Sequence, residues 1–239
     1  MKVLYIVSSL KKTGPTNQLY NIIKYLDFSQ FKPHIVTLSP EPEESMRNAF
    51  NELNVKIISC SLSRIKGMFY LPYLLKKIVK EINPHVIHTQ GIRSDMLSAH
   101  FLKEYKRIAT LRNYPYEDYK MTYGKILGTF MAYHHINSLK KIDIPVVCSE
   151  SIKMKVKPHR LKALVVRNGV DQNIFYPVTK EEKQFLRKKL EIPDDKNVFI
   201  SVGHLNSRKD PETVIRGFLS SVAKDNSLLL MIGDGPLRK

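Results

Sequence analysis

Residues 1–26 read MKVLYIVSSLKKTGPTNQLYNIIKYL, and this stretch decides the fold. Val3–Val7 is a continuous apolar run, which is typical of a strand buried on both faces of a parallel sheet. A polar loop follows it and leads into a helical pattern over Asn17–Leu26. A strand, a loop and a helix in this order predict the first unit of a doubly wound α/β domain.

The same alternation continues along the chain as far as residue 168. Further strands are expected at His34–Leu38, Lys56–Cys60, Val86–His88, Arg107–Leu111, Val146–Cys148 and Ala163–Arg167. Helices are expected between them, at Ser45–Leu53, Met68–Ile82, Ser94–Tyr105 and Tyr123–Leu139. The pattern therefore predicts a Rossmann-like domain over residues 1–168.

A second α/β domain is predicted from residue 169 onward. Asn168-Gly169 is a strong turn signal, because both residues tolerate positive φ. Beyond it, strands at Val198–Val202 and Leu228–Ile232 flank a helix at Pro211–Lys224. One strand-helix-strand unit cannot bury both of its faces alone, so residues 169–239 are expected to form an incomplete domain.

Composition limits the classes of partner and compartment. The 239 residues carry 39 Lys+Arg against 22 Asp+Glu, a formal net charge of +17, and this excess favours anionic partners. Nucleic acid is not expected among them, since no helix-turn-helix, zinc finger or RNA-binding signature is present. Cys60 and Cys148 form neither a disulfide framework nor a Cys-x-x-Cys pair, so a reducing cytoplasm is expected.

One basic segment suits a membrane surface. Ser61–Lys80 holds five basic residues and no acidic one, interleaved with Met68–Leu71 and Tyr73–Leu75. Basic residues beside aromatic and aliphatic ones favour peripheral contact with anionic lipid. A sheet-packing helix with a solvated basic face is the structural alternative. Pro72 interrupts the longest apolar run, so a spanning helix is not expected.

Polar residues follow two expected strands of the first domain. Gly14, in the first loop, lets a ligand approach the backbone, and the helix after it offers free N–H groups to an anion. His88 ends another expected strand, and Gln90 and Arg93 follow it, at the edge where open parallel sheets bind ligands. His85 lies three residues before His88, so the two rings face opposite ways and no metal pair is expected. An ordinary loop and a loop-capping histidine remain the structural alternatives.

Two further loops carry candidate ligand-binding residues. Arg112 and Asn113 begin a polar, aromatic loop of the kind that binds sugars by stacking and hydroxyl hydrogen bonds. Gly203, Arg208 and Lys209 lie between a strand and a helix that begins at Pro211. Cations beside a helix N-terminus suit a diphosphate without a metal ion. A packed loop and a solvated basic loop are the alternatives.

Several motifs in fixed order resemble the GT4 family of retaining glycosyltransferases. In the first half the resemblance rests on the Gly14 loop, the His88 segment and Val147–Glu150. In the second half the matching motifs are Val166–Asp171 with Phe175 and Pro177, Ser201–Leu205 with Lys209, and Met231–Pro236.

The resemblance implies a GT-B fold, with an acceptor-binding domain at 1–168 and a donor-binding domain beginning at 169. It implies a retaining transfer of a hexosyl group from an NDP-sugar to a glycan or lipid-linked acceptor. The setting would be surface polysaccharide assembly at the inner face of the membrane, with no metal or other cofactor. The residues implied are His88 for catalysis, Gly14, Gly203, Arg208 and Lys209 for the donor diphosphate, Gln90, Arg93, Arg112 and Asn113 for the acceptor, and Asn168 and Gly169 for the interdomain cleft.

The sequence departs from the family pattern in two places. His204 stands where the family usually has Arg, and no Glu-x7-Glu element follows, since Glu212 is the last glutamate. We therefore expect weak or absent transferase activity from these 239 residues alone. A non-catalytic acceptor-binding module, or a subunit that needs a separate donor-domain chain, is the alternative function.

Overall fold

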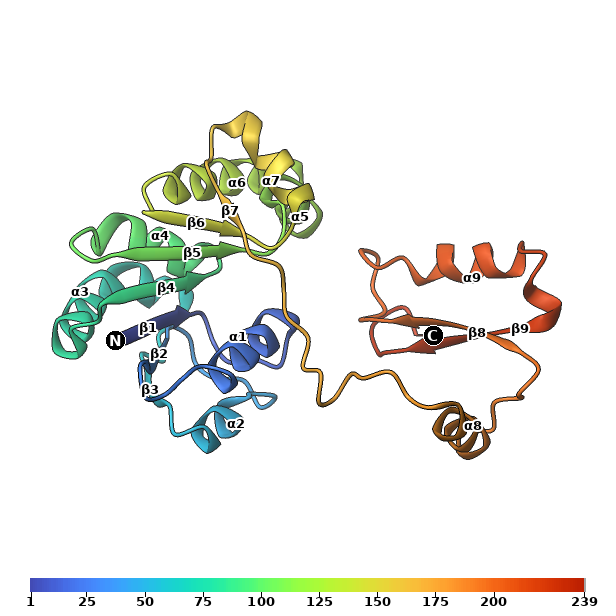
Figure 1. The fold of residues 1–239 in the computed structure, drawn as a ribbon. Coiled ribbons are helices and arrows are strands. Elements are labelled where there is room, and N and C mark those ends of the chain that lie inside the picture. The colour runs from blue at the N-terminus through green and yellow to red at the C-terminus, as the bar shows by residue number, and fades with distance from the viewer. Residues whose placement is uncertain (239) are drawn as a thin grey trace. The chain divides into compact units, whose positions relative to one another are not determined.

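The computed structural model describes residues 1–238, which divide into two compact units, Met1–Asp171 and a second beginning at Gln172 (Figure 1). The expected boundary lies three residues earlier, after residue 168. Residues 169–171 belong to the first unit because side chains of its first helix hold them. Gln18 Nε2 donates to the Gly169 carbonyl at 2.9 Å, and Lys24 Nζ contacts the Asp171 carboxylate at 2.8 Å.

The first unit is built on one seven-stranded parallel sheet, which confirms the predicted doubly wound α/β fold. Its strand order is β3-β2-β1-β4-β5-β6-β7, so the chain leaves β1 toward one edge and returns at β4 to build the other. The strands are β1 (Lys2–Val7), β2 (Lys32–Thr37), β3 (Lys56–Ser59), β4 (Val86–Gln90), β5 (Arg107–Leu111), β6 (Ile144–Val147) and β7 (Leu164–Val165).

Seven α-helices connect and cover these strands. They are α1 (Gly14–Lys24), α2 (Arg47–Glu52), α3 (Arg64–Ile82), α4 (Ile92–Phe101), α5 (Pro115–Tyr123), α6 (Lys125–Leu139) and α7 (Glu150–Val156). Among residues 1–238, no helix combines the length and the apolar character that crossing a bilayer requires. The loop expected after Leu111 is short, because Pro115 begins α5, and Gly124 at φ +82° separates α5 from α6.

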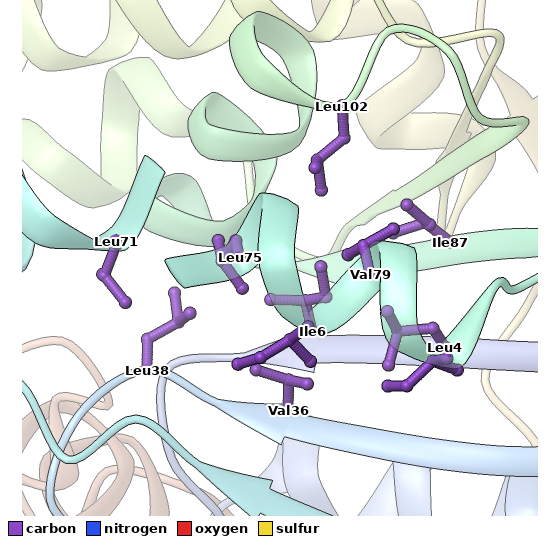
Figure 2. Close-up of a cluster of buried hydrophobic side chains, with 11 residues drawn as sticks. Leu4, Ile6, Val36, Leu38, Leu71, Leu75, Val79, Ile87 and Leu102 are labelled. Atoms are coloured by element: carbon purple, nitrogen blue, oxygen red, sulfur yellow. The ribbon is translucent and has the colours of Figure 1, made fainter. Parts of the chain in front are cut away.

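Both faces of the sheet carry a buried apolar core. Figure 2 shows one cluster, in which Leu4, Ile6 and Val36 from the strands pack against Leu75 and Val79 of α3. The alternate residues of β1 point to the opposite face and pack against α1 and α2, in a second cluster that includes Tyr5, Val7, Leu19, Ile23 and Phe50. Burial on both faces explains why β1 reads as a continuous apolar run.

The second unit holds α8 (Lys180–Lys189) and a two-stranded parallel sheet of β8 (Asn197–Val202) and β9 (Ser227–Ile232), joined by α9 (Pro211–Leu219). Ile200 and Val202 of β8 are more than half exposed. Among the described residues this unit is thus the strand-helix-strand arrangement expected from the sequence.

Candidate functional site

A cavity of about 430 Å³ opens at the carboxyl ends of β1, β4 and β5. The strand order reverses between β1 and β4, and open α/β sheets bind ligands at such a switch point because the neighbouring loops diverge there. The cavity is lined by the β1–α1 loop, by Gln90–Ile92 and by Thr110–Asn113, with Asp118, Tyr119 and His135 from α5 and α6.

The β1–α1 loop forms one wall and is held firmly. The carboxylate of Glu41 accepts hydrogen bonds from the Leu10 amide at 2.9 Å and from Ser45 Oγ at 2.7 Å. Gly14 begins α1, and a Cβ added to it would meet no atom within 4 Å. No side chain caps the first turn of α1. The helix therefore presents open backbone amides beside the cavity, which suits an anion.

Gln90 and Arg112 form a second wall. Arg112 donates to Gln90 Oε1 from Nε at 3.3 Å and from Nη2 at 3.1 Å, and it also donates to Asn168 Oδ1. Gln90 Nε2 is buried and has no hydrogen-bond partner among the described residues. Burial lowers the pKa of Arg112 from its ordinary value. Two of the expected acceptor-binding side chains thus converge on the cavity, and exposed Asn113 lies beside them.

His88 lies beneath this wall and does not line the cavity. It occupies the middle of β4, two residues before the strand ends, and its Nε2 lies 2.8 Å from Oγ1 of Thr110, which does line the cavity. Its ring packs against Tyr5 with the centroids 5.4 Å apart. Burial, together with the positive charge of Arg112, lowers the pKa of His88 to about 4. The imidazole is therefore neutral at pH 7.

Arg93 points away from the cavity. Its guanidinium donates to Ser39 Oγ at 2.8 Å and to the Ser63 carbonyl at 3.1 Å. It lies against Gly67, where an added Cβ would approach Arg93 Nη2 closely enough to clash. Arg93 therefore connects α4 to the loop after β2 and to Ser63, the residue that caps α3, instead of joining Gln90 and Arg112 as expected from its place in the sequence.

Gly203, Arg208 and Lys209 belong to the second unit. The aliphatic part of the Lys209 side chain lies over Gly203, and Arg208 is exposed. A Cβ on Gly233, at φ +151°, would overlap the Gly203 carbonyl, so the loops after β8 and β9 press together. Asp210 caps α9, accepting from the Thr213 amide at 3.2 Å. The N-terminus of α9 therefore already carries a carboxylate beside the two expected cations.

Three further residues line the cavity, and of these only His135 was not expected from the sequence. Asp118 and Tyr119 end the polar, aromatic stretch from Arg112 that is expected to bind sugars, and they belong to α5. His135 belongs to α6, where adjacent His134-His135 suggests a surface pair. The structure corrects that interpretation, because His135 is only 1% exposed. The signal that could have revealed it is the spacing of small residues on α6, Gly128, Ala132 and Ser138, which are all buried with His135. No cluster of potential metal ligands occurs within residues 1–238.

Comparison with known proteins gives consistent results. The family model named Glycosyltransferase Family 4 matches residues 13–173. An O-antigen biosynthesis glycosyltransferase, WclY of Escherichia coli, is 27% identical over 245 aligned residues, which cover 100% of this chain and 63% of that protein.

Solved structures show the same fold. Anabaena Alr3699/HepE in complex with UDP matches with a TM-score of 0.76 and 14% identity, over 98% of this chain and 61% of that one. The lipopolysaccharide outer core galactosyltransferase WaaB in its apo form matches with a TM-score of 0.66 and 17% identity, over 99% and 62%. The fold is thus of the GT-B type, and the chain spans less than two thirds of the length of these relatives. Since the family model covers more than half of the chain, the protein belongs to glycosyltransferase family 4.

Proposed function

We propose that this chain provides the acceptor-binding domain and the first part of the donor-binding domain of a retaining, NDP-sugar-dependent hexosyltransferase. The acceptor is a glycan or lipid-linked glycan of surface polysaccharide assembly, in keeping with the names of the relatives. The observation that carries the proposal is the cavity at the switch point, with the buried, unpartnered amide of Gln90 at its wall. A buried donor without a partner costs free energy, and a ligand oxygen would relieve that cost.

The chemistry of the walls supports this assignment. Gln90 Nε2 and the Arg112 guanidinium supply donors for the ring and hydroxyl oxygens of a sugar. The β1–α1 loop supplies backbone amides at Gly14, which would stabilise the negative charge that develops on a departing diphosphate. In the second unit, Lys209 and Arg208 would supply positive charge for a donor diphosphate. Neutral His88 would act through Thr110, by holding that hydroxyl in place at the cavity floor.

Gln90→Glu tests the acceptor site. Glutamate keeps the oxygen that accepts from Arg112 and replaces the unpartnered amide with an acceptor, so the sugar loses a donor while the wall stays intact. We expect about tenfold weaker binding of octyl glycosides, measured by NMR titration. Gln184→Glu, on exposed α8, is the matched control and is expected to bind like the wild type. Equal affinities for wild type and Gln90→Glu would contradict this role.

Transfer is tested with UDP-hexoses and octyl glycosides as substrates. We expect the anomeric configuration of the donor to be retained in any product, as read from NMR coupling constants. An inverted product would refute the retaining mechanism. Glycoside binding without any transfer by this chain is the result expected if these residues act only as an acceptor-binding module.

We also propose that α3 contacts an anionic membrane. Its buried face, which includes Gly67, Leu71 and Leu75, packs toward the sheet. The opposite face exposes apolar and aromatic side chains to between 63% and 75%, namely Ile65, Met68, Phe69, Tyr70 and Tyr73. Lysines 66, 76, 77 and 80 are exposed on the same helix. A lipid-linked acceptor would place its sugar near such a surface.

Replacing Lys76 and Lys77 together with glutamate is expected to weaken sedimentation with phosphatidylglycerol vesicles at least about tenfold. Each lysine near an anionic surface contributes about 1 kcal/mol, and the acidic replacements add repulsion. Replacing Lys188 and Lys189 of α8 makes the same charge change on another helix and should have a smaller effect. Vesicle binding that is equal with phosphatidylglycerol and phosphatidylcholine would exclude the membrane proposal.

A further inference from the structure

Three residues from three helices form a hydrogen-bonded chain that ends at the cavity. Tyr119 of α5 has its phenol oxygen 2.7 Å from His135 Nδ1 on α6. His135 Nε2 lies 2.8 Å from Asp95 Oδ2 on α4. Tyr119 and His135 both line the cavity described above. In Figure 1, α4, α5 and α6 lie at the half of the sheet that holds β5 and β6.

The inner part of this chain is fully removed from water. Asp95 is 0% exposed and His135 is 1% exposed, whereas Tyr119 is half-buried and reaches the cavity. The second carboxylate oxygen of Asp95 has no hydrogen-bond partner among the described residues. Burying a carboxylate is costly unless it is paired, so the pairing with His135 is held strongly.

With a neutral imidazole beside the Asp95 carboxylate, every hydrogen bond in the chain has one direction. A carboxylate can only accept, so the imidazole proton lies on Nε2 and points at Asp95. Nδ1 then carries a lone pair and accepts from the hydroxyl of Tyr119. Because the phenol proton is used in this bond, the oxygen presents only lone pairs to the cavity. Burial and the charge of Asp95 raise the pKa of Tyr119, so the phenol stays protonated.

The geometry points to Tyr119 as a specificity-determining residue that accepts a hydrogen bond from one hydroxyl of a neutral pyranoside in the cavity. His135 and Asp95 are positioning residues that keep the phenol oxygen an acceptor. Gln90 Nε2 and Arg112 supply hydrogen-bond donors elsewhere in the same cavity. The site therefore offers both donors and acceptors, and sugar hydroxyls use both. This inference rests on the proposed acceptor-binding role of the cavity.

A purely structural tie among α4, α5 and α6 would give the same three contacts, so the test must measure ligand discrimination. The probes are octyl β-D-glucoside, octyl β-D-galactoside and octyl N-acetyl-β-D-glucosaminide, with the monodeoxy derivatives of the glycoside that binds best. Tyr119→Phe removes the oxygen and keeps the ring. Tyr123→Phe makes the same change on the same helix, at a residue that does not line the cavity.

We expect Tyr119→Phe to bind the best parent glycoside about five- to tenfold more weakly in an NMR titration, and Tyr123→Phe to bind it like the wild type. One monodeoxy derivative should bind wild type and Tyr119→Phe equally, because it lacks the hydroxyl that donates to the Tyr119 oxygen. A Tyr119→Phe affinity within twofold of wild type for every probe would overturn the inference. So would the absence of binding of all three glycosides to the wild type.

A second measurement needs no ligand. The ring nitrogen shifts of His135 are expected to show the proton on Nε2, and a proton on Nδ1 would refute the inference, because the phenol would then be a donor. Failure of this inference is distinguishable from failure of the proposed function. Sugar transfer with an unchanged KM in Tyr119→Phe would reject the inference alone, whereas the predicted binding pattern without transfer would support the inference and limit the proposed function to acceptor binding by these residues.

Discussion

His135→Ala is expected to lower the free energy of unfolding of the first unit by about 3–5 kcal/mol. The imidazole is the one hydrogen-bonding side chain recorded at the buried Asp95 carboxylate within residues 1–238. Its removal leaves that carboxylate in a protein interior without compensation, and it also opens a void between α4 and α6. Urea unfolding, followed through NMR signals of β4 and β5, measures the effect on this unit separately from the second one.

Two comparisons separate the buried charge from the loss of volume. His134→Ala changes the neighbouring exposed residue of the same helix, so we expect a change of no more than about 0.5 kcal/mol. Adding Asp95→Asn to His135→Ala should recover part of the lost stability, because it removes the orphaned charge. The same Asp95→Asn change in the wild type should destabilise, because it breaks the pair. A double variant no more stable than His135→Ala would show that packing, and not charge, sets the cost.

The sheet could be predicted from sequence because helices cover both faces of each strand. Buried parallel strands are continuous apolar runs, and this local pattern is sufficient to place β1, β2 and β5 within a residue or two. Helix starts were less predictable. α3 begins at Arg64, four residues before the expected Met68, because Ser63 caps it through the Lys66 amide. That cap lies outside the apolar pattern.

The candidate site was predictable only where it follows from strand ends. Gln90 and Arg112 reach the cavity because parallel strands end at one edge of the sheet. Arg93 belongs to the helix that follows, and its side chain is drawn to Ser39 and Ser63. His88 points to the same face of the sheet as Gln90. It lies two residues earlier in β4, farther from the strand end, and therefore beneath the wall.

The contact between Tyr119 and His135 could not be predicted from local pattern. Their positions depend on how closely α5 crosses α6 at Gly128, where an added Cβ would come within 2.4 Å of the Tyr119 carbonyl oxygen. A close helix crossing of this kind is a tertiary contact between segments that each look ordinary alone. Small residues on one helix face indicate that another helix crosses there, but they do not show which helix it is.

Acidification from pH 7 to pH 4 is expected to destabilise the first unit by about 3 kcal/mol through His88 alone. The ring is packed between Tyr5 and Thr110, and burial, aided by the charge of Arg112, lowers its pKa from 6.5 to about 4. In the unfolded chain the imidazole takes up a proton near pH 6.5, whereas in the folded unit it stays neutral until about pH 4. Between these values the unfolded state binds more protons, so stability falls as the pH falls.

The expected size follows from the two pKa values. Each pH unit between them corresponds to about 1.4 kcal/mol, so the contribution is fully present above pH 6.5 and about 3 kcal/mol of it is lost by pH 4. His88→Gln keeps a polar side chain beside Thr110 but cannot take up a proton. Its stability relative to the wild type should therefore improve by about 3 kcal/mol between pH 7 and pH 4. Titration of the carboxylates is common to both proteins and cancels in this difference.

Thr110→Val is the matched control for the pH dependence. It removes the hydrogen-bond partner of His88 but keeps the imidazole and its apolar surroundings, so the wild-type slope should remain. Urea unfolding at half-unit steps from pH 7 to pH 4 gives the three curves. Because desolvation is the larger cause of the shift, parallel curves for wild type and Thr110→Val, with a flatter curve for His88→Gln, are expected. Parallel curves for wild type and His88→Gln would mean that the ring is protonated as readily in the folded unit as in the unfolded chain, and that it is not held neutral beneath the cavity.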